Sequence, residues 1–161
     1  MIQSVRSHTG PAALIKLAQD VLNTEIAGLA AVRDRLNART PEKAPLVLAL
    51  GLLAACTGRV VVTGIGKSGL VGRKLAATFS STGTPAFFLH PVEGAHGDLG
   101  SLRKDDVIIA ISNSGETAEL NAILPALKSL GTSLIAMTGR EDSTLGRLAD
   151  VTLHSGVPRE A

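Results

Sequence analysis

The chain has 161 residues, enough for one domain with a single substantial core. Hydrophobic residues make up 45% of it, a high fraction that predicts a large buried subunit interface as well as a core. The net charge is only +2, the basic residues are scattered, and three Phe with no Trp or Tyr leave almost nothing to stack on bases, so we exclude a nucleic-acid partner.

The sequence also points away from a membrane partner. No apolar run reaches the ~18 residues that span a bilayer, and the N-terminus lacks the charged-then-apolar pattern of a signal peptide, so we expect a cytoplasmic location. The lone Cys56 closes the apolar run Leu52–Cys56, and we interpret it as a small buried side chain rather than a nucleophile.

Residues 1–58 are predicted to form two helices. The first begins near Pro11, which suits the first helical position, and its apolar residues keep a period of about 3.6 as far as Leu36. The second has a start signal at Thr40–Glu42 and is apolar on nearly all sides over Leu46–Cys56. Such a helix needs cover on several sides, either within one chain or from a second subunit. We expect both helices to pack on the sheet and on a partner copy, in a homodimer or homotetramer.

From residue 59 to residue 161, strands alternate with helices, which is the signature of a parallel sheet with right-handed crossovers. The pattern predicts an α/β fold, a three-layer α/β/α sandwich around a five-stranded parallel flavodoxin-like sheet, with the ligand at the carboxyl ends of the strands. The predicted strands are 60–63, 85–90, 107–111, 133–138 and 151–154. The predicted helices between them run through 75–79 to a stop at Gly83, over 119–130 and over 144–148.

The stretch Val107–Leu120 joins a buried strand, a hydroxyl-rich loop and a helix start. The unsatisfied N–H groups and the dipole of the helix attract an anion, and Gly115 lets the backbone come close. The loop has no lysine and no Gly-Lys-Ser/Thr triplet, so it is typical of a phosphate cradle, that is, a binding loop for one phosphate monoester. The alternative is that Ser114 only caps the helix and Gly115 only makes the turn. The side-chain donors that the loop offers are Ser112, Asn113, Ser114 and Thr117.

The loop Gly64–Gly69 resembles a dinucleotide fingerprint, but the acidic residue expected after the next strand is absent, since that strand ends in Leu89-His90-Pro91. A Walker A motif fails as well, because Val61 stands where its first glycine is needed. The loop is then a second cradle that closes on the other end of a small polar ligand. Lys67, between Gly66 and Ser68, supplies a point charge to it, or else is a solvated surface lysine.

The loop of residues 91–100 holds Glu93, His96 and Asp98 within six positions. Glu93 and His96 fall on one face of a helical turn, but no further His or Cys stands at ligand spacing, so we expect no metal site. His96 is predicted to act as a general acid or base, with a structural Nδ1 hydrogen bond as the alternative. His90 and His154 each close an apolar strand and are interpreted as structural.

These motifs resemble the sugar isomerase (SIS) domain of arabinose 5-phosphate isomerases, from about Val60 to the last residue. The residues that carry the resemblance are Gly-Ile-Gly-Lys-Ser-Gly at 64–69, Ser-Thr-Gly-Thr-Pro-Ala-Phe-Phe at 81–88, His-Pro-x-Glu-x-x-His-Gly-Asp-Leu-Gly at 90–100, Ser-Asn-Ser-Gly-Glu-Thr at 112–117 and Val-Pro-Arg-Glu-Ala at 157–161. The resemblance implies interconversion of D-ribulose 5-phosphate and D-arabinose 5-phosphate, a step toward the sugar acid Kdo of bacterial lipopolysaccharide or capsule.

Carried over by position, the resemblance gives Ser112, Ser114 and Thr117 to the phosphate. The matches to the family's active-site lysine, histidine and two glutamates are Lys67, His96, Glu119 and Glu160. Family members continue past Pro-Arg-Glu-Ala through a segment with another active-site histidine and usually through paired CBS domains, whereas this sequence ends at Ala161. We therefore expect it to bind sugar phosphate but to isomerise it poorly.

The residues also meet the requirements of the chemistry. Moving a carbonyl between C1 and C2 of a sugar needs a base and donors for the enediolate, and no redox cofactor. Glu119, in the first turn of the cradle helix, is placed for the base, Lys67 for the oxyanion and His96 for ring opening, while Glu116 points away as a helix-start acid. The rival interpretations are a non-catalytic sugar-phosphate sensor, which has no use for a base, and a structural oligomerisation domain, which does not explain the hydroxyl cluster.

Overall fold

The computed structural model describes residues 10–36, 44–157 and 159. They fall into two compact units, one made of residues 10–36 with 157 and 159, the other of residues 44–156. The second unit contains the whole sheet and is the part of the molecule that positions the candidate site.

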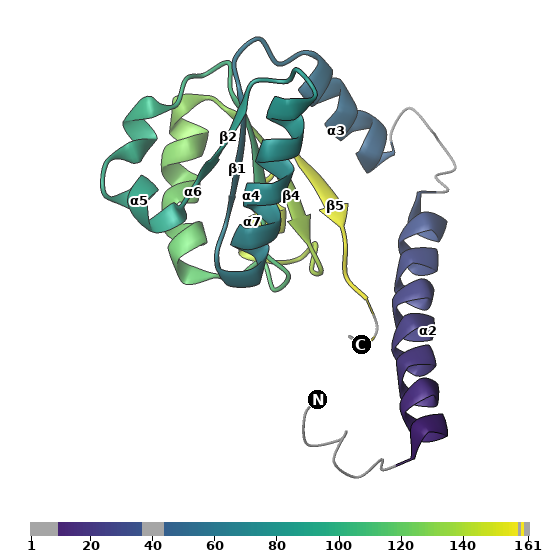
Figure 1. Ribbon diagram of the computed structural model, residues 1–161. Helices are drawn as coiled ribbons and strands as arrows, with labels where there is room; N and C mark the ends of the chain where they lie inside the picture. Colours follow the sequence, from purple (N-terminus) through teal and green to yellow (C-terminus); the bar gives the residue numbers. More distant parts are fainter. Residues whose placement is uncertain (1–9, 37–43, 158, 160–161) are drawn as a thin grey trace. The chain divides into compact units, whose positions relative to one another are not determined.

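The sheet has five parallel strands in the order β2-β1-β3-β4-β5, which confirms the flavodoxin-like prediction (Figure 1). Strands β3, β4 and β5 have the predicted bounds, whereas β2 is shorter than expected, because Pro85 and His90 lie outside it. The strands are β1 (Val60–Gly64), β2 (Ala86–Leu89), β3 (Val107–Ile111), β4 (Ser133–Thr138) and β5 (Val151–His154).

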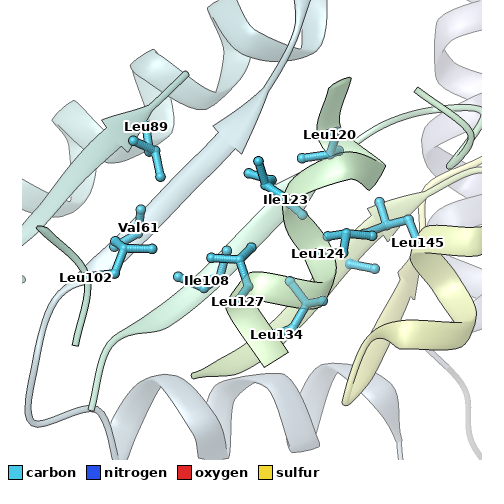
Figure 2. Close-up of a cluster of buried hydrophobic side chains, with 12 residues drawn as sticks. Val61, Leu89, Leu102, Ile108, Leu120, Ile123, Leu124, Leu127, Leu134 and Leu145 are labelled. Carbon is cyan, nitrogen blue, oxygen red and sulfur yellow. The ribbon is translucent and has the colours of Figure 1, made fainter. Parts of the chain in front are cut away.

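Helices cover both faces of the sheet, as a three-layer sandwich requires (Figure 1). On one face, α4 (Gly66–Ser81) and α3 (Pro45–Ala54) pack against Val60, Val62 and their neighbours. The other face carries α5 (Pro91–Ala95), the short 3₁₀ helix η2 (Asp98–Ser101), α6 (Ala118–Leu130) and α7 (Thr144–Leu148). The core on that side joins α6 leucines to the strands (Figure 2). Its labelled members are Val61, Leu89, Leu102, Ile108, Leu120, Ile123, Leu124, Leu127, Leu134 and Leu145.

The ends of α6 are set by local sequence. Its N-cap is Thr117, in extended conformation, and it ends at Gly131, whose φ of +79° is the left-handed geometry that a helix C-terminus favours in glycine. The predicted helix 119–130 is therefore confirmed to within one residue. The same holds for α7, whose N-cap Ser143 accepts from the N–H of Gly146.

Helix α3 begins at Pro45, a residue with a fixed φ that suits the first helical position. The predicted start signal at Thr40–Glu42 lies outside the described residues. Only Ala49 of α3 is fully buried, while Leu52 and Leu53 pack partly against the sheet. The rest of this apolar helix, including Val47 and Leu50, is exposed.

The first unit consists of α2 (Pro11–Arg35) and two C-terminal residues. Pro11 is at its first position, as predicted. Gly28 is its only fully buried residue, and a Cβ there would lie 3.1 Å from Cγ1 of Val157. Ile15, Leu22 and Leu29 recur every seven residues and are exposed, so this helix presents an apolar stripe. None of the described helices is both long enough and apolar enough to cross a bilayer.

Candidate functional site

The loops after β1 and β3 lie side by side at the carboxyl edge of the sheet. The strands pair up to Gly64 and Ile111, so their loops start level with one another. A Cβ on Gly64 would come within 2.9 Å of the carbonyl oxygen of Ile111, and one on Gly69 within 2.8 Å of the carbonyl oxygen of Gly64. Glycine at these positions lets the end of β1 lie close to β3 and lets α4 start close to the end of β1.

In the loop between β3 and α6, residues 112–117, the first and last hydroxyl groups face each other. The Oγ of the buried Ser112 is 2.9 Å from Oγ1 of Thr117, and it also accepts from the N–H of Gly115 at 3.1 Å. Gly115 has a φ of +65°, which confirms the predicted turn. The N-terminal amides of α6, the helix that follows this loop directly, have no intrahelical acceptor. Hydroxyl groups, free amides and the positive end of a helix therefore lie together at the start of α6.

The alternative role for Ser114, as the cap of this helix, is wrong. Thr117 is the N-cap, and its side chain pairs with Ser112 rather than with the helix. The Oγ of Ser114 instead accepts from the N–H of Glu116 at 3.2 Å, within the loop. The helix start thus makes no side-chain cap bond of its own, and its first amides stay available to an anion.

Residues from the end of β4 through α7, together with Asn121 of α6, hold the backbone of this loop. The carbonyl oxygen of Gly115 accepts from the N–H of Leu145 at 3.1 Å and from Nδ2 of Asn121 at 3.2 Å. The carbonyl oxygen of Asn113 accepts from the N–H of Gly139 at 2.9 Å. A Cβ on Gly115 would overlap the side chain of Ser143, so glycine is needed for contact as well as for the turn.

Glu116 is the charged residue of the loop, and it faces α7. Its Oε1 accepts from the N–H of Thr144 at 2.8 Å, and Nδ2 of Asn121 lies 3.5 Å from its Oε2. Hydrogen bonding to Thr144, helped by the nearby Arg147 and Arg140, lowers the pKa of the Glu116 carboxyl below its ordinary value. Glu116 does point away from the cradle, as expected, but the helix start that it serves is that of α7 rather than that of α6.

The loop after β1 presents Lys67 as the second residue of α4. Lys67 is exposed, and among the described residues its amine has no hydrogen bond or ion pair, so the solvated-lysine alternative stays open. Gly66 opens the helix with a φ of +60°, and Ser68 is half-buried beside it.

His96 follows β2, the strand next to β1 on the other side. It is exposed and ends α5, its N–H bonded to the carbonyl oxygen of Glu93 at 3.0 Å, so the two residues share one helical turn as predicted. The side chain of His96 has no hydrogen bond within the described part of the chain, and nothing there supports the structural alternative. His90 is structural, because its Nδ1 accepts from the N–H of Val92 at 3.3 Å and caps α5.

Glu119 lies in the first turn of α6, exposed, two residues after the hydroxyl of Thr117. Glu160 lies outside the described residues. In the ranges 10–36, 44–157 and 159, no group of three His, Cys, Asp or Glu side chains is arranged to hold a metal ion. The loops after β2, β1 and β3, with Lys67, His96 and Glu119, thus open at one edge of the sheet.

Two residues in the support of the loop have no role in the sequence interpretation. Asn121 lies one turn into α6, and its spacing of four from Thr117 could have placed it on the loop side of the helix. Thr144 gives no local signal, because it lies 28 residues away and its main contact with the loop is made by its backbone N–H.

A family model, described as the SIS domain, matches residues 53–161, which is more than half of the chain. The chain belongs to the SIS domain family. The match covers the whole sheet and every loop of the candidate site in this SIS domain.

Two curated relatives of this SIS domain have the same name. It is 51% identical over 143 residues to the arabinose 5-phosphate isomerase KdsD of Salmonella typhi, a stretch that covers 89% of this chain and 42% of that one. The KdsD of Pseudomonas aeruginosa is 56% identical over 115 residues, which cover 71% and 35% of the two chains. The chain of this SIS domain therefore spans less than half the length of these curated relatives.

A solved structure agrees with the fold. The Escherichia coli CFT073 protein c3406, in complex with arabinose 5-phosphate, superposes on the SIS domain with a TM-score of 0.81 at 43% identity, covering 94% of this chain and 78% of that one.

Proposed function

We propose that this chain is an aldose–ketose isomerase domain that interconverts D-arabinose 5-phosphate and D-ribulose 5-phosphate. The observation that carries the proposal is the anion cradle of residues 112–117, followed at once by an exposed carboxylate, Glu119, in the first turn of the same helix. An anion seat alone fits any phosphorylated ligand, whereas a carboxylate beside it fits proton transfer on the carbon chain. The KdsD relatives, at 51% and 56% identity, support the choice of sugar.

In this proposal the phosphate is bound by the hydroxyl groups of Ser112, Ser114 and Thr117 and by the amide of Asn113. The free N–H groups of α6 and its dipole add to the attraction. The other end of the sugar faces the loop of Gly66, Lys67 and Ser68, whose single positive charge is unpaired within the described residues. What supports this arrangement is the level start of the two loops at paired strands.

The chemistry requires proton movements between adjacent atoms. A base removes the proton from C2 of the open aldose, the electron pair forms the C1–C2 double bond of an enediolate, and a proton is returned to C1 while the hydroxyl proton passes from O2 to O1. Glu119 is proposed as the carrier of the carbon-bound proton, Lys67 as the stabiliser of the oxyanion, and His96 as the acid that opens the sugar ring. Glu160 completes the proposed catalytic set.

Since the relatives extend well beyond the matched region, their full activity belongs to longer chains. We propose that the region matched by the SIS domain model binds the sugar phosphate and carries the groups that transfer the proton.

We also propose that the chain acts as a homodimer or homotetramer, with residues 1–58 as the part that contacts other subunits and residues 59–161 as the sugar-phosphate core. The support is the apolar stripe of α2, together with the exposed side chains of α3.

Proton transfer can be tested separately from binding. The chain is incubated with ribulose 5-phosphate in D₂O, and deuterium at C2 of the product is followed by NMR. Glu119→Gln keeps the size and hydrogen bonding of the side chain but cannot act as a base, so we expect exchange to fall about 10²–10⁴-fold while sugar phosphate still binds. Ser114→Ala with Thr117→Ala is the converse control, since it removes phosphate donors and should weaken binding by at least about tenfold.

Undiminished exchange in Glu119→Gln removes Glu119 from the mechanism. Binding without any exchange in the unmodified chain favours a sugar-phosphate sensor instead, and unchanged binding in the double alanine variant places the phosphate elsewhere.

A further inference from the structure

Glu116 and Asn121 make contacts that hold the phosphate-seat loop, residues 112–117, in place. Neither residue is among the proposed phosphate donors. Glu116 stands between Ser114 and Thr117 in sequence, yet its carboxylate turns outward to the N–H of Thr144, 2.8 Å away. Asn121 completes the connection, since its Nδ2 donates to the carbonyl oxygen of Gly115 at 3.2 Å and lies 3.5 Å from Oε2 of Glu116. The side chain of Glu116 thus connects the loop to both α6 and α7.

The loop needs such an anchor because it is short and exposed at its tip. Asn113 and Ser114 are both exposed, and the hydroxyl groups that would bind a phosphate lie on residues two to three positions apart. Donors of this kind bind an anion well only when they converge on it in a fixed arrangement. A hydrogen bond to an ionised carboxylate is stronger than a neutral one, so the contact of Glu116 with Thr144 is a suitable anchor.

A carboxylate at this place also has a cost. It lies close in sequence to Ser114 and Thr117, and it repels any phosphate bound there. The charge is partly offset, because Arg147 and Arg140 lie near Glu116 on the α7 side. Of these, Arg140 is also 3.5 Å from Asp142, so it is shared. A negative charge beside an anion seat is explained if the anchor improves the seat by more than the repulsion weakens it.

We propose that Glu116 is a positioning residue of the phosphate seat, which fixes the loop through the N–H of Thr144 so that the Ser112, Ser114 and Thr117 hydroxyls converge on the ligand. The inference rests on the proposed function, because it concerns the same phosphate. It gives Glu116 no contact with the substrate and no part in proton transfer.

Anchoring and charge repulsion predict opposite results for two variants of Glu116. Glu116→Gln removes the charge but keeps an oxygen that accepts from the N–H of Thr144. Glu116→Ala removes both. If Glu116 matters only as a charge, both variants bind phosphate more tightly. If it positions the loop, the alanine variant binds more weakly and the glutamine variant binds as well as the unmodified chain or better.

Thr144 allows the same bond to be removed from its other end. Thr144 is the first residue of α7, where a proline is best tolerated, and Ser143 before it has the extended ψ of 167° that a following proline requires. Thr144→Pro therefore deletes the N–H donor with little harm to the helix, and it also removes the Thr144 hydroxyl, which contacts Glu116 and lies 3.5 Å from Nη2 of Arg147. Joined to Glu116→Ala, it should cause no further loss, because the two changes remove one interaction.

The test is calorimetric titration of the 161-residue chain with D-arabinose 5-phosphate, with folding checked by thermal melting. We expect affinity to fall about tenfold in Glu116→Ala and in Thr144→Pro, and to stay within about twofold or rise in Glu116→Gln. In the deuterium assay, Glu116→Ala should raise the concentration of half-saturation and leave the saturated rate unchanged, the reverse of Glu119→Gln. If Glu116 were needed only for folding, its removal would not raise the half-saturation concentration while leaving the saturated rate unchanged.

Three outcomes are decisive. Equal or tighter binding by Glu116→Ala overturns the positioning role, and so does a loss that adds to that of Thr144→Pro. If Glu116→Ala unfolds before it can be titrated, Glu116→Gln and Thr144→Pro decide. Weaker binding by Glu116→Gln, with no loss of binding by Thr144→Pro, contradicts the proposal. If the unmodified chain does not bind the sugar phosphate, the proposed function fails instead.

Discussion

Glu116 has a lowered pKa, and the direction of this shift sets a pH dependence. Hydrogen bonds from Thr144 are the largest cause, and both Arg147 and Arg140 add to the lowering. Because the folded pKa lies below the unfolded value of 4.5, the contact stabilises the folded chain fully above that value and is lost as the pH falls through the folded pKa.

We therefore expect the amide of Thr144 to keep its hydrogen-exchange protection at neutral pH and to lose it only in acid, below the ordinary titration range of a glutamate. Exchange measured by NMR between neutral and acidic pH reports this directly. Glu116→Gln is the control, because its amide does not titrate and its Thr144 protection should not follow this step. A Glu116 carboxyl that titrates at or above 4.5 would contradict the expected direction.

The residues of the loop divide into those that sequence reveals and those that it cannot. Gly115 and Thr117 were predictable, since a glycine turn and a hydroxyl at a helix start are local patterns. The hydrogen bond from the N–H of Glu116 to Ser114 was not predictable. Whether Ser114 caps the helix depends on the conformation of the turn between them, which places the N-cap at Thr117. The partner of Glu116 is 28 residues away and acts mainly through its backbone N–H, for which no residue type gives a signal.

At the scale of elements, the starts of β1 and β3 are joined by a buried carboxylate. Asp106 has a fully covered side chain, whose Oδ1 accepts from the N–H of Arg59 at 2.8 Å and whose Oδ2 accepts from the N–H of Arg103 at 2.9 Å. The guanidinium of Arg59 lies 3.3 Å from the same Oδ2. Asp106 thus satisfies two backbone donors at the amino edge of the sheet, opposite the candidate site.

Asp106→Ala should destabilise the chain by roughly 3–5 kcal/mol, because it leaves two backbone amides and the Arg59 guanidinium without their acceptor. Urea unfolding followed by circular dichroism measures the change. Asp105→Ala is a matched control, since its side chain is exposed and has no hydrogen bond among the described residues, so it should cost less than about 0.5 kcal/mol. Equal effects of the two variants would mean that burial of Asp106 does not determine its contribution.

Element bounds in the sheet unit were predictable because their signals are local. The apolar runs of β3, β4 and β5 lie between turn residues, and Gly131 ends α6 where the sequence predicts. The start of α3 was harder to predict, because Ala44, its N-cap, has no side chain that can accept a hydrogen bond, and Pro45 alone marks the position. Which side chains of this all-apolar helix are buried was not predictable, since that depends on which of its faces packs on the sheet.

At the scale of the molecule, the distribution of apolar surface is uneven. Both faces of the sheet are covered by helices, so the central strands are buried almost throughout. The helices before β1 are different. Leu22 and Leu29 of α2 are 56% and 71% exposed, and Leu50 of α3 is 54% exposed, although leucine is a residue type that usually lies inside. Exposed apolar surface of this kind, present on each of these two helices, is typical of protein interfaces.

We expect light scattering at micromolar concentration to give the mass of a dimer or tetramer. Val47 and Leu50 lie one turn apart on the exposed side of α3, so Val47→Lys with Leu50→Lys places two charges on the proposed contact and should lower the mass to that of a monomer. Leu130→Lys with Leu148→Lys is the matched control, because these leucines are also partly exposed but belong to α6 and α7, on the other face of the sheet. The control variant should keep the mass of the unmodified chain. A monomeric unmodified chain rules out the assembly, and a control that dissociates equally shows that added charge, rather than this face of α3, sets the result.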